Sequence, residues 1–314
     1  MKQSILGIVL VCTACTSSAD DLLGETTQDG LSFNGLSLNG VSFNGISFNG
    51  TSIAGASLAG VGVAGTSGKG LPLVATSVLG PPLTGSALVG SSWTGITYEG
   101  TQVKLRVDAA SAGAAPNTDL WFYSLSYQTT SGWFPLCGLD ASNLPIQAVS
   151  VAGVWRQVPG DLASYGPSAT LFTLACRGKT IGKCVELGYK PYRGYADQLA
   201  SCVRLLRGDF CGSGVSYTVD GNMLNLYDHV GVQADVAQWT PEAEWTPSGA
   251  SCVNSHNAAR FDLVVSRDPK CIQHDETPTC GTSFANGAVL IDELSPTVVT
   301  QIQAAQAAQT TLSR

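Results

Sequence analysis

The apolar positions in the first third of the chain recur with a period of five. A Gly stands at every fifth position from Gly30 to Gly100, except at Ala75, and the centre of each five-residue unit is apolar except at Gly68. A helix repeats every 3.6 residues and a strand every two, so this period fits neither. Glycine accepts backbone angles that other residues resist, which suits a chain that turns a corner in every unit. The pattern therefore predicts a repetitive coil over residues 30–100.

From about residue 101 the apolar positions take up the periods of strands and helices. Alternating apolar residues predict strands at 103–107 and 121–127, with a hairpin turn at 129–132 after the second. Apolar residues at helical spacing from Leu199 to Leu206, followed by Gly208, predict a helix that ends at a glycine. The tail after Pro296 is rich in Ala and Gln and predicts a second helix. Shorter runs predict further strands at 169–176, 217–219, 223–227, 261–265 and 289–291.

The five-residue units are similar to those of the pentapeptide-repeat family, as L-S-F-N-G, V-S-F-N-G and A-S-L-A-G show best. The resemblance implies a four-sided right-handed β-helix in which the central residue of each unit points inward. Fourteen units would form about three and a half coils, above the roughly three repeats that a stable stack needs. The alternative is a flexible Gly/Ser-rich stalk. We expect the ordered coil for residues 30–65, and both structures remain open for residues 66–100.

The first 21 residues have the features of an export signal. Lys2 supplies a short positive region, and residues 5–11 form an apolar stretch shorter than the roughly 20 residues of a membrane-spanning helix. Thr13 and Ala14 precede Cys15 in a sequence that resembles a bacterial lipobox, whose cysteine is acylated and becomes the mature N-terminus. This predicts a lipoprotein signal and tether over residues 1–21, lipidation at Cys15 and a membrane anchor. The alternative is ordinary signal-peptidase cleavage, which releases a soluble protein.

Eight cysteines follow the repeat region, and none lies within it. An even number of cysteines in an exported chain favours disulfide bonds. The sequence does not select among the possible pairings, and the neighbouring Cys271 and Cys280 are the only pair that we single out. The cysteines predicted to form disulfides are Cys137, Cys176, Cys184, Cys202, Cys211, Cys252, Cys271 and Cys280.

The predicted fold class is an N-terminal pentapeptide-repeat-like β-helix, or a partly flexible repeat stalk, followed by a disulfide-rich α+β domain that is mostly β. The domain is assigned to residues 101–294 and the polar Ala/Gln-rich helix to residues 295–314. The chain carries a net charge of −7 without a basic cluster, which argues against nucleic acid as a partner. Residues 31–100 hold only Lys69 and Glu99 as charged groups, so the repeat does not imitate a polyanion.

Several stretches of the second half resemble the ADYC domain, which occurs in proteins of myxobacteria and related organisms, many of them expected to be lipoproteins. They include A-C-R-G-K-T-I-G-K-C-V-E-L-G-Y-K-P, C-V-R-L-L-R-G-D-F-C-G-S-G-V-S-Y and E-A-E-W-T-P-S-G-A-S-C-V. The resemblance covers about residues 103–265. The motif that names the family falls on Gly208-Asp209-Phe210-Cys211, with Gly in place of Ala and Phe in place of Tyr. The resemblance implies structural cysteines, an Asp that belongs to a helix end or turn, and no assigned activity.

Candidate chemistry is sparse, because only His229, His256 and His274 are present as histidines. Cys271, His274, Asp275 and Glu276 are of types that bind metals, and a disulfide-closed surface loop is the interpretation we favour. Glu242 and Glu244 form a possible carboxylate pair on one strand face, as in glycosidases, although a solvated strand face is the commoner explanation. We expect no catalytic residues, no metal and no cofactor.

Three further patterns have structural explanations. Asp220-Gly221-Asn222 is interpreted as a turn rather than a calcium loop, because no run of further oxygen ligands follows it. Arg207-Gly208-Asp209 spells a cell-adhesion tripeptide, which we interpret as a coincidence. Trp121, Tyr123 and Tyr127 alternate along a strand and are assigned to the core rather than to a ligand groove.

These features predict an exported lipoprotein of the outer membrane or cell surface, with the periplasmic face as an alternative. Its expected role is structural or binding, and the molecular function stays open. The repeat would act as a spacer or interaction surface, and the cysteine-rich domain as a recognition head. An envelope protein or a glycan is the expected kind of partner. The alternative is a secreted hydrolase whose acidic groups converge only in the folded protein.

Overall fold

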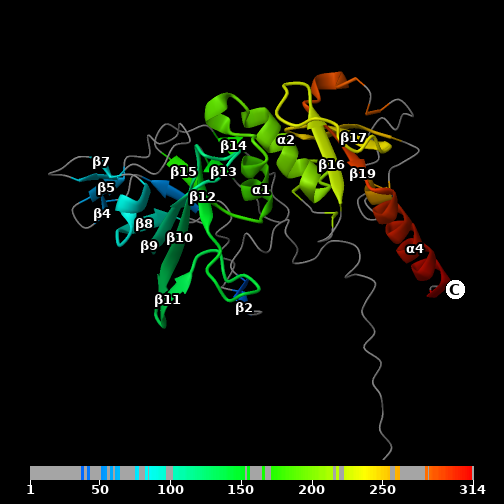
Figure 1. Ribbon diagram of the computed structural model, residues 1–314. Coiled ribbons are helices and arrows are strands. Elements are labelled where there is room, and N and C mark those ends of the chain that lie inside the picture. The colour runs from blue at the N-terminus through cyan, green and yellow to red at the C-terminus, as the bar shows by residue number, and fades with distance from the viewer. Residues whose placement is uncertain are drawn as a thin grey trace, which may run out of the picture.

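The computed structural model describes the second half of the chain most fully. The described residues are 85–96, 102–152, 154–155, 165–166, 171–214, 217–218, 223–254, 259–261, 280–281 and 283–312, together with seven short strands between residues 37 and 83. Two antiparallel sheets flank a pair of helices (Figure 1). Seven of the strands between β3 and β15 form the larger sheet, and the four strands β16 to β19 form the smaller one.

The larger sheet has seven strands in the order β11-β10-β12-β15-β3-β8-β9, and an additional pairing joins β9 to β10. This pairing closes six of the strands into a ring, with β11 attached outside it as the second arm of a hairpin. The strands are β3 (Thr51–Ala54), β8 (Ser92–Ile96), β9 (Gln102–Ala112), β10 (Trp121–Thr129), β11 (Gly132–Pro135), β12 (Ala148–Ala152) and β15 (Leu171–Cys176).

The two faces of β10 belong to different hydrophobic clusters. Tyr123, Leu125 and Tyr127 pack with Leu105 and Leu174 in one cluster, and Phe122 packs with the helices in another. Successive strand residues point to opposite faces, which explains this division. Tyr123 and Tyr127 are buried, as predicted for core aromatics. The sheet is therefore covered on both faces along β10.

Two helices connect the sheets. Helix α1 (Thr180–Glu186) follows β15, and helix α2 (Ala196–Arg207) packs against the smaller sheet (Figure 1). The smaller sheet has the order β16-β19-β17-β18, all antiparallel, with β16 at one edge. Its strands are β16 (Leu224–Asp228), β17 (Pro241–Thr246), β18 (Gly249–Val253) and β19 (Leu290–Leu294).

The remaining elements are short, apart from the C-terminal helix α4. None of the helices among the described residues has both the length and the apolar character that a bilayer crossing requires. The elements are β1 (Ser37–Leu38), β2 (Val41–Ser42), β4 (Ser57–Leu58), β5 (Val61–Val63), β6 (Ala75–Ser77), β7 (Pro82–Leu83), β13 (Val154–Trp155), β14 (Tyr165–Gly166), the 3₁₀ turns η3 (Gly85–Leu88), η4 (Pro191–Arg193) and η6 (Ala285–Gly287), and α4 (Pro296–Leu312).

The predicted α+β class with mostly β structure is confirmed for the domain. The strands at 103–107 and 121–127, the hairpin turn after β10 and the helix that ends at Gly208 are all present. Residues 217 and 218 of the strand predicted at 217–219 are not in a strand, and β16 pairs with the distant β19. Much of the repeat lies outside the described residues. Its short strands pair antiparallel, and the predicted β-helix is not confirmed.

Three disulfides lie wholly within the described residues, as the cysteine count predicts. Cys137 pairs with Cys176, Cys184 with Cys202, and Cys252 with Cys280. Cys211 is also disulfide-bonded. The pairing singled out from sequence, Cys271 with Cys280, is wrong, because Cys280 lies across from β18, with 5.8 Å between its Cα and that of Cys252. Cys271 and Cys15 lie outside the described residues.

Candidate functional site

Two adjoining cavities open on the side of the domain where α1 ends. The first has a volume of about 720 Å³ and lies between α1, the last turn of α2 and the edge strand β16. The second has a volume of about 600 Å³ and lies beside the loop 140–147. Both are lined by Gly178 and Glu186, so they meet at the end of α1. The apolar lining of the first cavity comes from Leu187, Leu206, Leu224, Leu226, Ala234 and Val236.

Three side-chain amides also line the first cavity, and hydrogen bonds fix their orientation. Asn117 Nδ2 donates to the carbonyl of Glu186 at 2.9 Å, and Gln233 Nε2 donates to the carbonyl of Leu187 at 2.6 Å. Asn225 Nδ2 donates to two carboxylates, at 2.8 and 2.9 Å. Asn225 uses both of its N–H donors in these bonds, whereas Asn117 and Gln233 each use one of two. The cavity thus combines oriented side-chain amides with a leucine floor.

An ion pair separates the two cavities. Arg177 forms two bonds to Glu186, Nε to Oε1 at 3.1 Å and Nη2 to Oε2 at 2.9 Å. Its guanidinium also lies over the ring of Phe122, 3.9 Å from the ring centroid. Such a bidentate and stacked arginine is held in one orientation. Its charge is matched by Glu186, so the wall between the cavities is neutral.

Arg260 lies at the centre of a cluster of charged side chains inside the domain. Its guanidinium donates to both carboxylate oxygens of Glu242, at 2.5 to 3.1 Å, and to Asp292 Oδ2 at 2.8 Å. All three side chains are 0% exposed. Trp245 Nε1 donates to Asp292 Oδ1 at 2.6 Å, and Arg260 Nη1 donates to the carbonyl of Leu205 near the end of α2.

The pKa of Asp292 reflects the burial of this cluster. Burial, and then the negative charge of Glu242, raise the pKa of Asp292 well above its usual range. A proton on Asp292 would leave one guanidinium and one carboxylate, and such a neutral cluster is the form in which charged groups tolerate a buried position. Neither Glu242 nor Asp292 lines the two cavities described above. Their role is to join α2, β17 and β19.

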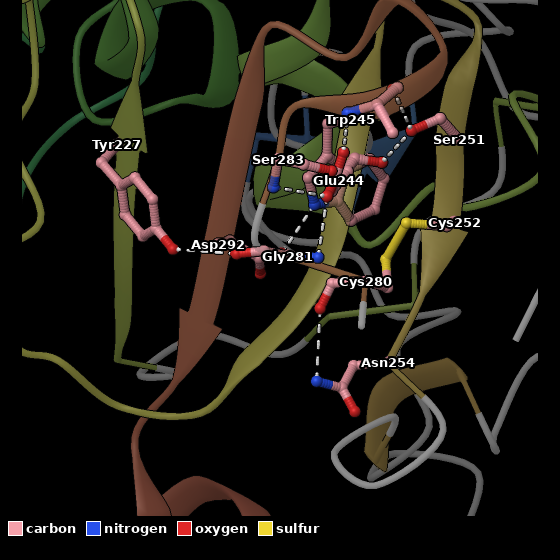
Figure 2. Close-up of a disulfide and its surroundings, with 11 residues drawn as sticks. Tyr227, Glu244, Trp245, Ser251, Cys252, Asn254, Cys280, Gly281, Ser283 and Asp292 are labelled. Carbon is pink, nitrogen blue, oxygen red and sulfur yellow. Dashed lines mark hydrogen bonds between the residues drawn. A yellow bond between two sulfur atoms is a disulfide. The ribbon is translucent and has the colours of Figure 1, made fainter. Parts of the chain in front are cut away.

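Glu244, also on β17, has a separate environment (Figure 2). Its carboxylate accepts hydrogen bonds from three backbone N–H groups of one loop, those of Gly281 at 2.9 Å, Ser283 at 3.4 Å and Ala285. The ligand atoms of Glu244, Cys252 and Cys280 lie within 4.8 Å of one another. The two sulfurs are joined to each other, however, and a metal needs thiolates. Glu244 therefore holds the loop 281–285 beside the disulfide.

Residues 208–211 form a tight corner between α2 and β18. Gly208 ends α2 in the left-handed conformation, with φ of 63°. Asp209 is 0% exposed and forms a salt bridge with Arg204, and its Oδ2 also accepts from Gly214 N at 3.1 Å. Arg204 in turn is 3% exposed at its side chain, so the pair is buried. The Asp therefore ties the end of the helix to the following turn.

The rest of this corner belongs to the hydrophobic core. Phe210 is 0% exposed, with its ring centroid 4.9 Å from that of Trp245 and 5.3 Å from that of Phe261. Its carbonyl accepts from Ala250 N at 2.9 Å, which ties the corner to β18. A Cβ at Gly212 would lie 1.9 Å from the carbonyl oxygen of Ser248, so only glycine permits this approach.

A family model described as ADYC domain matches residues 85–259, more than half of the chain. The chain belongs to the ADYC domain family. Comparisons with curated proteins and with solved structures gave no match. The match begins at η3 and extends through β18, so it includes α1, α2, β16 and the first cavity. The motif that names the ADYC domain is the buried corner at 208–211.

The structure of the ADYC domain shows where several residues singled out in the sequence lie. The solvated strand face predicted for Glu242 and Glu244 is wrong, since both are 0% exposed. The tripeptide Arg207-Gly208-Asp209 is buried, in agreement with a coincidental match. His229 is exposed, with its ring centroid 5.1 Å from that of Phe284. The residues 220–222, His256 and the group 271–276 lie outside the described residues.

The residues around the first cavity carry no signal in the sequence. Asn117, Leu187 and Asn225 are separated by tens of residues, and although Leu187 lies in a stretch that resembles the family, none of the three carries a chemical signature. Amides and leucines are common residue types, so their convergence is visible only in the folded ADYC domain. The sequence signals that lie nearest to the cavity are those for the helix that ends at Gly208 and for the strand at 223–227.

Proposed function

We propose that the ADYC domain is the recognition head of an exported lipoprotein and that the first cavity holds its ligand. The carrying observation is the combination of a leucine floor with three side-chain amides whose orientation is fixed by hydrogen bonds. Binding sites are concave, mostly apolar and equipped with a few oriented polar groups. The rim adds Lys183 and Glu186, and Glu186 is already paired with Arg177. Because most of the lining is apolar, the proposed ligand is uncharged, with an apolar part and a few polar groups that meet the amides.

The buried acidic groups support binding rather than hydrolysis. A hydrolase with paired carboxyl groups needs them beside its substrate. Glu242 and Asp292 form a pair around Arg260, but both are fully buried and satisfied by protein partners. The carboxylate of Glu244 likewise binds backbone groups of its own chain. These contacts assign the acids to stability.

Filling the first cavity tests the binding proposal. Ala234 is exposed and lines the cavity, so Ala234→Trp would place an indole there without entering the core. Thr130→Trp, in the exposed turn after β10, is the matched control. We expect amide chemical shifts around the cavity to respond to some members of a panel of neutral peptides, disaccharides and amphiphiles. Ala234→Trp should weaken each such response at least tenfold, and Thr130→Trp should leave it unchanged. Equal binding by both variants would contradict the proposal.

We also propose that Cys15 carries the lipid anchor. The supporting features are the short apolar segment, the small residues before Cys15 and the disulfides of the domain, which require an oxidising compartment. Cells that express the chain and are fed labelled palmitate should incorporate the label into the protein, and Cys15→Ser should abolish it. A Cys12→Ser variant serves as the control. A mature protein that starts beyond Cys15 without added lipid mass would contradict this assignment.

A further inference from the structure

The strand β16 is an edge strand, and its open side faces the first cavity. It pairs with β19 on one side, and no other strand is paired with it among the described residues. Leu224, Asn225 and Leu226 all line the cavity, although neighbouring side chains of a strand point to opposite faces. A cavity lined by consecutive strand residues runs along the edge of the sheet rather than over one face.

The register with β19 shows which backbone groups point to this edge. Ser295 N donates to Met223 O at 3.2 Å, so Met223 belongs to the set of β16 residues that bond to β19. In an antiparallel pair this set contains every second residue. The intervening residues, Leu224 and Leu226, therefore direct their N–H and C=O groups away from β19. Asp228 follows the same rule, because its N–H bonds outward to the carbonyl of Gln233 at 3.2 Å.

The Gln233 bond also limits the available edge. The chain that returns after β16 occupies the position opposite Asp228. Leu224 and Leu226 line the cavity, and within the described part of the chain no second strand pairs beside them. Two such residues lie about 7 Å apart along a strand and offer two donors and two acceptors. Apolar side chains are exposed at the rim, with Met223 62% and Val236 84% exposed. An unpaired strand edge flanked by exposed apolar side chains is typical of a surface that another chain covers.

We infer that the first cavity binds an extended, uncharged peptide segment of a partner protein, which adds to β16 as a fifth strand of the smaller sheet. The inference rests on the proposed function and names the class of its ligand. The peptide backbone would pair with Leu224 and Leu226, and its apolar side chains would contact Leu187 and Leu206. The amides of Asn117 and Gln233 would hydrogen-bond to polar groups of its side chains or of its outer edge. Strand addition gives affinity through the main chain and specificity through alternate side chains.

A proline substitution tests this geometry directly. Leu224→Pro removes an outward N–H and places a ring at the edge, while the bonds to β19 are kept, because proline is tolerated on the open side of an edge strand. Leu224→Ala is the matched control, since it removes the side chain and keeps the N–H. A random decapeptide display library, selected on the wild-type protein, supplies the probes. We expect the selected peptides to bind Leu224→Pro at least about tenfold more weakly and Leu224→Ala less than about threefold more weakly.

Scanning a selected peptide with single N-methyl groups gives a second, independent measurement on the wild-type protein, and it applies even if Leu224→Pro fails to fold. Methylation should weaken binding at alternate positions only, because every second peptide N–H would face β16. An N-methyl scan without this alternation, or a selection that retains no peptide, would overturn the inference. If Ala234→Trp still blocks a disaccharide or an amphiphile in that case, the proposed function stands and only the peptide class is lost. Selected peptides that bind Ala234→Trp as well as the wild type would overturn both.

Discussion

Arg260→Met is expected to destabilise the ADYC domain by about 3–5 kcal/mol, the cost of breaking a fully buried ion cluster. The substitution leaves Glu242 as a buried carboxylate without its cation, and Asp292 beside it with only the bond from Trp245 Nε1 of those described above. It also leaves the carbonyl of Leu205 without the bond from Arg260 Nη1. The free energy of unfolding, measured by denaturant titration with the disulfides intact, reports the loss. A cost below about 1 kcal/mol would contradict the buried cluster.

A compensating change distinguishes lost charge balance from lost packing. Glu242→Gln combined with Arg260→Met removes the carboxylate together with its cation, and the raised pKa of Asp292 favours its neutral form. No net charge is then left in the core. The double variant should therefore regain a large part of the stability that Arg260→Met loses. If it is no more stable than the single variant, the geometry of the arginine rather than its charge holds α2, β17 and β19 together.

Asp209→Ala is expected to cost about 3–5 kcal/mol of stability, because it strands the guanidinium of Arg204 in the interior. The bond that Gly214 N donates to Asp209 is lost as well, and with it the closure of the turn after α2. Thermal unfolding followed by circular dichroism measures the effect. Binding of any ligand to the first cavity should persist below the new unfolding temperature, since the corner at 208–211 does not line that cavity.

Asp197 supplies the matched control for Asp209. It lies in the first turn of the same helix, is exposed, and has the same chemistry. Asp197→Ala should cost no more than about 1 kcal/mol, the usual contribution of an acid near a helix N-terminus. An Asp209→Ala variant with unchanged stability and lost binding would mean that the family motif acts on a ligand rather than on the fold.

Local patterns in the sequence determined the elements of this domain. Alternation over 121–127 predicted β10, and the helical spacing that ends at Gly208 predicted α2. Both signals, the spacing of side chains along an element and a glycine that ends a helix, depend only on neighbouring residues. The count of cysteines, together with the predicted export signal, predicted disulfides. The quoted stretches around Gly208-Asp209-Phe210-Cys211 were sufficient to identify the ADYC family.

The tertiary structure alone decided which segments meet. The spacing of apolar residues predicted the strand at 223–227 but not its partner, because β16 pairs with β19, more than sixty residues later. The pairing of Cys280 with Cys252 has the same origin, because a disulfide requires Cα atoms about 4.4–6.8 Å apart and not a short loop.

The tertiary structure also decided that Glu242 and Glu244 are buried and that the first cavity forms. Alternation along β17 predicts a solvated face for both glutamates, and their burial follows from Arg260 and the loop 281–285, which lie beyond β17 in the sequence. The cavity needs Asn117, α1 and β16 to converge. The spacing of apolar and polar residues along a helix or strand predicts which face of that element each side chain occupies. Whether that face meets solvent, an ion partner or a cavity depends on distant segments, and so it is determined only when the chain packs.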